Sequence, residues 1–159
     1  MPSSVVILFL DFDGVLHPAG CNTTRHFSEL PRFEAVMRQY PDVRIVVSSA
    51  WQRTFPLPAL RALFSADIAA RIIGRTLTAD PEGDAKNRHQ QIWLYLGRAG
   101  ATSARWIALD DAESQFPRRC PQLVLCDPAR GFDELAAQQL IARLTSLKVP
   151  RQELKPEAA

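Results

Sequence analysis

Short apolar runs rich in Val, Ile and Leu alternate along this chain with amphipathic stretches of helical length. Buried parallel strands read as continuous apolar runs and are connected by helices, so the alternation is typical of an α/β fold. The predicted strands are residues 5–10, 44–47, 70–73, 106–109 and 123–126, and the predicted helices are residues 28–39, 57–64, 87–98 and 132–147. We therefore expect a Rossmann-like three-layer sandwich around a central parallel sheet of about five strands.

The chain has 159 residues, the size of one ordinary globular domain, which can bury a core without disulfides or a structural metal. We expect this domain to span residues 1–148. Residues 149–159 contain Pro150, Pro156 and mixed charges without apolar periodicity, so they are predicted to form a flexible tail.

Charge and cysteine content narrow the class of protein. The 19 Lys and Arg residues nearly balance 17 Asp and Glu residues. The resulting net charge of +2 lacks the basic signature of a dedicated nucleic-acid binder but allows an anionic substrate. The cysteines, Cys21, Cys120 and Cys126, lack the spacing of a disulfide framework or zinc site, which favours reduced thiols in the cytoplasm. The apolar run at 5–10 is too short to span a membrane, and no membrane association is expected.

The strongest chemical signal is the motif Leu10-Asp11-Phe12-Asp13-Gly14-Val15, in which a buried strand ends in two carboxylates. Burying such charges is costly unless they have a partner, and a bound cation is a natural one. The tight turn that Gly14 permits lets Asp13 lean over Asp11, so the two acids can take separate roles.

Polar residues also follow two other predicted strands. Ser48 and Ser49 follow the strand at 44–47, and Asp110 and Asp111 follow the strand at 106–109. If the first strand is central and these two strands flank it, each neighbour lies about 4.8 Å away and all these side chains meet at one edge of the sheet. Open α/β sheets bind ligands at such a point, where the strand order reverses.

These motifs resemble those of the haloacid dehalogenase (HAD) superfamily, whose first motif is an apolar strand followed by Asp-x-Asp-Gly-Val or Asp-x-Asp-Gly-Thr. The resemblance implies a HAD-like fold in which Asp11 is the catalytic nucleophile. It also implies that Asp13 donates a proton to the leaving oxygen and later activates the water that hydrolyses an aspartyl-phosphate. The presence of Asp13 points to phosphatase chemistry instead of dehalogenation.

The same resemblance assigns the groups that bind the phosphate. Ser48 matches the family's Ser or Thr that hydrogen-bonds the transferring phosphoryl group, and Ser49 is expected to contribute a backbone N–H or to cap the next segment. With Gly14, these serines form the expected substrate-binding set. The basic residue that the transition state needs is either Arg88 or Lys86. Arg88 is favoured by its place in a helix's first turn, whereas Lys86 is the family's more usual residue type.

The resemblance further implies a Mg²⁺ cofactor. Asp11, Asp13 and Asp110 are the expected metal-binding residues, with Asp111 acting through a metal-bound water or by orienting its neighbours. The oxygen ligands suit Mn²⁺ equally, so the sequence leaves the metal open. Asp127, which precedes a proline after the last strand, is interpreted as an ordinary turn residue outside the site.

No gap between the motifs is long enough for a large cap domain, so the site is expected to be open. An open site suits a phosphorylated substrate on a bulky carrier, such as a nucleic-acid end, although a small phosphoester also fits. The strings Asp11-Phe-Asp-Gly-Val-Leu-His-Pro and Ser48-Ser-Ala-Trp more narrowly resemble capless HAD domains of bacterial RNA-repair proteins. That resemblance implies removal of a terminal phosphate.

Two other functions share this fold: a non-catalytic binding or regulatory module, and a phosphotransferase. A binding module has no chemical need of both Asp11 and Asp13, whereas a phosphotransferase uses the same residues as a phosphatase. At the mouth of the site, Trp51 is either a core residue or a stacking surface, and His17 is either a lining residue or a solvated loop residue.

Overall fold

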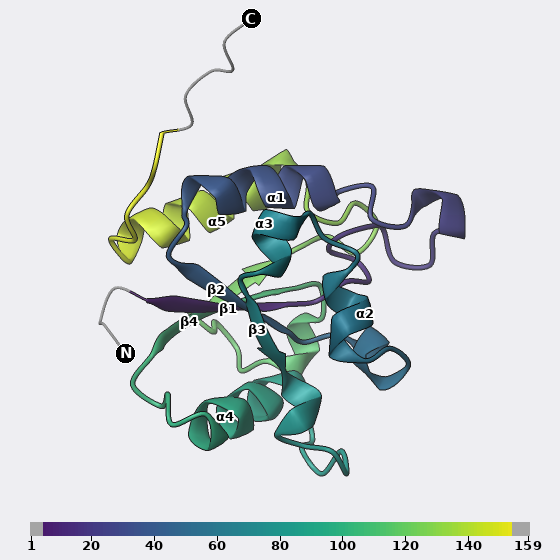
Figure 1. Cartoon of the computed structure of the whole chain (residues 1–159), viewed down its shortest axis with the longest axis vertical. Coiled ribbons are helices and arrows are strands. Elements are labelled where there is room, and N and C mark those ends of the chain that lie inside the picture. Colours follow the sequence, from purple (N-terminus) through teal and green to yellow (C-terminus); the bar gives the residue numbers. More distant parts are fainter. Residues whose placement is uncertain (1–4, 154–159) are drawn as a thin grey trace, which may run out of the picture.

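The computed structural model describes residues 5–153, which form one parallel sheet with strand order β3-β2-β1-β4-β5 (Figure 1). The strands are β1 (Val6–Leu10), β2 (Val43–Val47), β3 (Ile72–Arg75), β4 (Arg105–Asp110) and β5 (Leu123–Leu125). The predicted fold class and the central position of the first strand are both confirmed.

Helices cover the two faces of this sheet. They are α1 (Leu30–Gln39), α2 (Leu57–Arg61), α3 (Ala66–Ala69), α4 (Arg88–Arg98) and α5 (Glu134–Ser146). Short 3-10 turns lie at η1 (Thr23–Arg25), η2 (Ala50–Arg53), η3 (Thr76–Thr78) and η4 (Glu113–Gln115). Figure 1 shows α1 and α5 side by side on one face and α4 on the other, which gives three layers.

The alternation of side chains along β1 explains these layers. Val6, Leu8 and Leu10 belong to one core cluster, together with buried residues of α1 and α5. Ile7 and Phe9 belong to a second cluster, which contains buried residues of α4. Because successive strand residues face opposite sides, one fully buried strand supplies both cores.

The register of the central strands places the site. Leu10 is paired with Val47 on one side and with Leu109 on the other. The residues that follow Leu10, Val47 and Leu109 therefore lie at the same edge of the sheet, which we call its carboxyl edge. The ladder continues there, since Ser48 N–H donates to the Leu10 carbonyl at 2.8 Å.

One part of the predicted secondary structure differs from the observed one. The predicted helix 57–64 ends at Arg61, and the predicted strand 70–73 is displaced to Ile72–Arg75. The buried carboxylate of Glu34 accepts hydrogen bonds from the backbone N–H and the hydroxyl of Ser65, at 2.8 and 2.6 Å. These hydrogen bonds hold Ser65 at the start of α3. Because α3 takes up the residues just before the strand, β3 begins later than predicted.

The end of the described chain has packing contacts. Val149 is buried against the main core, and Gln152 N–H donates to the Gln39 carbonyl at 2.7 Å. The rest of the predicted tail, residues 154–159, lies outside the described residues, and its flexibility stays a prediction. No helix within residues 5–153 has the length and apolar character needed to cross a membrane. The segments joining the described strands contain no cap domain.

Candidate active site

Three carboxylates converge at the carboxyl edge of the sheet. Asp11 and Asp110 are each only 2% exposed, and Asp111 is half-buried beside them. Each residue offers an oxygen that lies within 4.8 Å of the oxygens of the other two. Backbone groups fix two of the side chains, because Phe12 N–H donates to Asp11 Oδ1 at 2.8 Å and Ala112 N–H donates to Asp110 Oδ1 at 2.9 Å.

Arg88 is the positive charge that lies among these acids. Its Nη1 is 2.9 Å from Asp11 Oδ1 and 2.8 Å from Asp110 Oδ2, and it also donates to the Ser48 carbonyl at 3.1 Å. One guanidinium thus connects all three central strand ends.

The helix start explains why Arg88, rather than Lys86, reaches the site. The side chain of Asn87 caps α4 by accepting from Gln90 N–H at 2.9 Å, so Arg88 is the first helical residue. Lys86 lies outside the helix with an exposed side chain, and no ion pair involving it occurs in the described part of the chain.

Burial makes the acidic cluster electrostatically unfavourable without a further cation. Desolvation, with a contribution from Asp110, raises the pKa of Asp11 to about 8, although the charge of Arg88 opposes the shift. Desolvation likewise raises the pKa of Asp110. The single charge of Arg88 does not neutralise three carboxylates. A divalent cation with oxygen ligands fits this donor set.

Asp111 occupies space that only glycine leaves open. A Cβ built on Gly14 would lie 2.0 Å from Asp111 Oδ2, and Gly14 has a φ of +77°, a conformation that favours glycine. Gly14 therefore lets the third carboxylate approach the acidic cluster.

Replacing Gly14 by Ala is expected to lower the free energy of unfolding by more than about 1 kcal/mol, from strain and from the clash. The variant should also bind Mg²⁺ more weakly, because Asp111 must move. Gly20→Ala is the matched control, since Gly20 has a φ of +70° and no atom within 4 Å of its added Cβ. Equal Mg²⁺ affinity of the two variants in calorimetric titrations would contradict the role given to Gly14.

Ser48 and Ser49 take different positions. Ser48 Oγ is buried and forms no hydrogen bond within the described residues, so it has a donor available for a bound anion. Ser49 caps η2, where its Oγ accepts from Trp51 N–H at 3.2 Å, which is one of its two expected roles. Both serines, with Arg53 and Arg88, line a polar cavity of about 90 Å³. These groups can hold the oxygens of a phosphate.

Asp13 lies apart from the other acids. Its side chain is 52% exposed, and its Oδ1 is 2.7 Å from His17 Nε2 and accepts from Trp51 Nε1 at 3.1 Å. Its carboxylate is therefore not among the converging oxygens, although it was expected among the metal-binding residues. The sequence did not reveal these two partners of Asp13.

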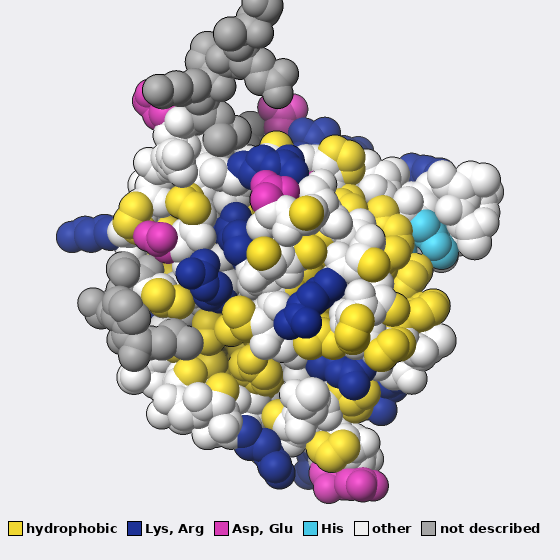
Figure 2. Space-filling view, viewed as in Figure 1, with side chains coloured by type: hydrophobic (Ala, Val, Ile, Leu, Met, Phe, Trp, Pro, Cys, Tyr) yellow, Lys and Arg dark blue, Asp and Glu magenta, His cyan; other side chains and the backbone are white. Residues whose placement is uncertain are grey.

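Aromatic residues surround Trp51. Its ring stacks on Phe55 at 5.6 Å and contacts Phe12 and Phe27. The core interpretation of Trp51 is thus the better one, because neighbouring rings occupy much of its surface. The outer residue, Phe55, and Leu63 beyond α2 are exposed, and Figure 2 shows hydrophobic side chains on the face that carries α2.

Mg²⁺ is expected to raise the melting temperature, and more strongly at pH 8 than at pH 6. Because the pKa of Asp11 is raised from 3.8 to about 8, the metal-free folded state holds a proton that the unfolded chain releases. The contribution of Asp11 to the free energy of unfolding therefore falls as the pH rises from the unfolded-state pKa of Asp11 to its folded-state pKa. Mg²⁺ binding offsets this loss once Asp11 is ionised. Thermal unfolding with MgCl₂ or with NaCl of equal ionic strength tests this. A shift that is equal at both pH values would contradict it.

Comparison with known proteins gives a family match over most of the chain. The chain matches the family model described as "HAD domain in Swiss Army Knife RNA repair proteins" over residues 7–137, from β1 into α5. The match spans all of the converging residues. No curated protein and no solved structure matches the chain.

Proposed function

Because this chain belongs to the family of HAD domains found in Swiss Army Knife RNA repair proteins, we propose that it is a Mg²⁺-dependent phosphatase acting on phosphomonoesters. The observation that carries the proposal is the contact of the buried Asp11 carboxylate with Arg88, beside the unpartnered hydroxyl of Ser48. A nucleophile is thereby placed next to groups that bind an anion.

In the first step, a carboxylate oxygen of Asp11 attacks the phosphorus atom. The bond from phosphorus to the leaving oxygen breaks, its electron pair stays on that oxygen, and Asp13 supplies the proton that makes it a neutral hydroxyl. Arg88 and Ser48 hold the equatorial oxygens of the phosphoryl group, where negative charge is spread in the transition state.

In the second step, water attacks the aspartyl-phosphate. The Asp13 carboxylate takes a proton from the water, and the bond from phosphorus to Asp11 breaks. Inorganic phosphate leaves, and both aspartates return to their starting states. Asp11, Asp110 and Asp111 would hold Mg²⁺, which would supply positive charge to stabilise the negative charge of the transferring phosphoryl group.

The proposed substrate is a phosphate at the end of a nucleic acid. Two observations favour a bulky substrate: the described residues include no cap domain, and the matched family is named for RNA repair proteins. Without a lid, the site has no need to enclose the whole molecule.

The test is phosphate release from oligonucleotides with a 5′- or a 3′-phosphate, compared with nucleoside monophosphates and an aryl phosphate, with and without Mg²⁺. We expect Mg²⁺-dependent release, with a value of kcat/KM for one oligonucleotide at least equal to that for the mononucleotides. Release from small phosphoesters alone would refute the substrate assignment. No release from any substrate would favour the binding module.

A further inference from the structure

The carboxylate of Asp13 is held by two donors on one of its oxygens. Oδ1 lies 2.7 Å from His17 Nε2 and 3.1 Å from Trp51 Nε1. No group in residues 5–153 donates a hydrogen bond to Oδ2. A half-exposed acid on a loop would otherwise sample several rotamers, so these contacts select one orientation.

The hydrogen bonds of His17 fix its tautomer. Phe27 N–H donates to His17 Nδ1 at 3.2 Å, so Nδ1 carries no proton. The neutral ring must then carry its proton on Nε2, which donates to Asp13. His17 is a donor with one defined direction, not a group that alternates between donor and acceptor.

The ring of His17 is also held rigidly. It is only 1% exposed and stacks on His26, with centroids 4.6 Å apart and planes 23° apart. The loop around it is closed by backbone bonds, in which Gly14 N–H donates to the His17 carbonyl and Glu29 N–H to the Leu16 carbonyl. The stacked His26 ring and the closed loop together prevent the imidazole of His17 from turning away from Asp13.

Trp51 reaches Asp13 from a different part of the chain. It lies in η2, whose start is fixed by the Ser49 cap, and its ring packs against Phe12 and Phe55. The indole N–H is a donor only, so it must point at an acceptor, and Asp13 is that acceptor.

We propose that His17 and Trp51 are positioning residues that hold Asp13 through Oδ1, so that Oδ2 is the oxygen that gives the proton to the leaving group. Because two N–H donors occupy Oδ1, the exchangeable proton resides on Oδ2. As the bond from phosphorus to the leaving oxygen breaks, this proton moves to that oxygen and Asp13 becomes a carboxylate. The inference rests on the proposed function, in which Asp13 is the general acid.

The test varies the leaving group and measures kcat/KM, which reports steps up to formation of the phospho-enzyme. A dinitrophenolate leaves without a proton, whereas a sugar hydroxyl needs one. Trp51→Phe and His17→Leu are expected to lose roughly 10- to 100-fold in kcat/KM on a 3′-phosphorylated oligonucleotide, part of what general acid catalysis supplies. They should lose less than about 3-fold on dinitrophenyl phosphate, because that reaction bypasses the acid.

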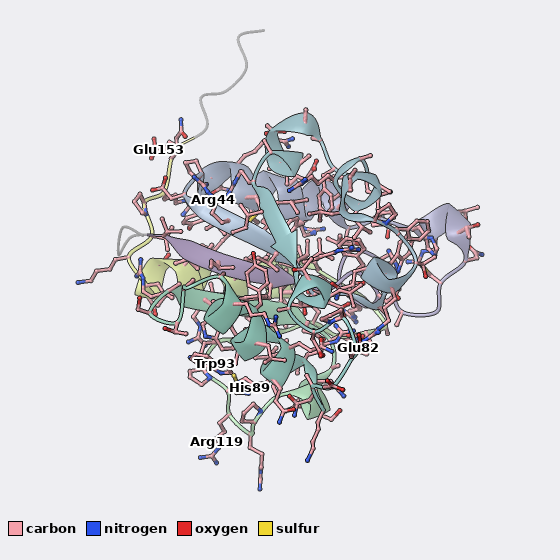
Figure 3. All side chains as sticks on the ribbon, turned by 60° about the horizontal axis from the view of Figure 1, so that its bottom comes forward. Arg44, Glu82, His89, Trp93, Arg119 and Glu153 are labelled. Atoms are coloured by element: carbon pink, nitrogen blue, oxygen red, sulfur yellow. The ribbon has the colours of Figure 1, made fainter. Side chains whose placement is uncertain are left out.

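Two further variants separate positioning from damage to the fold. Trp93→Phe is the matched control, because Trp93 Nε1 also donates to a side chain, His89 Nε2, at the surface of α4 (Figure 3). It should retain activity on both substrates. His17→Gln is the conservative variant, since its amide can accept from Phe27 N–H and donate to Asp13, and it should regain much of the lost activity.

A second readout does not depend on activity. Long-range ¹H–¹⁵N NMR spectra should show His17 with a protonated Nε2 and an unprotonated Nδ1, and Asp13→Ala should shift the Trp51 indole resonance. A proton on Nδ1, or equal losses on both substrates, would overturn the inference. If the wild type released no phosphate, both the proposed function and this inference would fail. If the wild type were active and the variants lost activity equally on both substrates, only this inference would fail.

Discussion

Asp11→Asn is expected to lower phosphate release by at least about 10³-fold while the protein stays folded, because the amide cannot act as the nucleophile. The variant should keep or increase the free energy of unfolding in the absence of Mg²⁺. Burial and the neighbouring Asp110 raise the pKa of Asp11 to about 8, so the metal-free protein holds this carboxyl largely protonated at neutral pH, and Asn replaces it with another uncharged group of nearly equal volume. Phosphate release and urea denaturation measure the two effects separately.

Asp127→Asn is the control for this experiment. Asp127 also follows a strand at the carboxyl edge, but it is exposed, and its Oδ1 accepts from Ala129 N–H at 2.9 Å, a bond that Asn can retain. The control should retain wild-type activity. Retained activity in Asp11→Asn would refute the nucleophile assignment, and equal losses in both variants would show that the acids act only through net charge.

Arg88→Met is expected to abolish most activity and to lower the free energy of unfolding by about 3 kcal/mol, the cost of leaving buried charges without their partner. Arg88 contacts both Asp11 and Asp110, and about a fifth of its side chain is exposed, which keeps the cost at the low end of the range. Urea denaturation in metal-free buffer measures the stability, because Mg²⁺ would mask part of the loss.

Lys86→Met is the matched control, since it removes the other candidate cation from the same segment. Its side chain is exposed, so the free energy of unfolding should change by no more than about 0.5 kcal/mol, and activity should be largely retained. Loss of activity in Lys86→Met with normal activity in Arg88→Met would reverse the assignment of the basic residue.

The sequence predicted the layers well because hydrophobic runs decide them. The central strand β1 is fully apolar, β4 is apolar from Trp106 to Leu109, and the acid-ended runs at Leu10 and Leu109 leave little freedom of register. The region between α1 and β3 was predicted less well. There the chain path depends on one buried side chain, Glu34, whose bond to Ser65 spans distant positions and leaves no local pattern.

The site could be predicted where it depends on strand ends and not where it depends on loops. The meeting of Asp11, Ser48 and Asp110 follows from strand order. The sequence favoured Arg88 over Lys86 for its place in the first turn of the predicted helix but left both open, because Lys86 lies only two residues earlier. In the structure the Asn87 cap makes Arg88 the first helical residue, and the Arg88 guanidinium contacts Asp11 and Asp110.

The sequence placed His17 and Trp51 near the mouth of the site, but their contacts with Asp13 could not be predicted, for a similar reason. Their bonds to Asp13 join residues 4 and 38 positions apart through loops, and they depend on a specific ring orientation. A histidine shortly after the second acid is a weak signal by itself. It gains meaning only when its other ring nitrogen is seen to accept from Phe27 N–H.

The most direct test of the phosphatase proposal is to trap the covalent intermediate. Wild-type protein turning over a phosphorylated oligonucleotide with Mg²⁺ would be quenched with borohydride, which reduces an aspartyl-phosphate to homoserine, and its peptides mapped by mass spectrometry. The proposal predicts homoserine at position 11, and none without Mg²⁺ or in Asp11→Asn. Phosphate release with an unmodified Asp11, or with reduction at another residue, would contradict it.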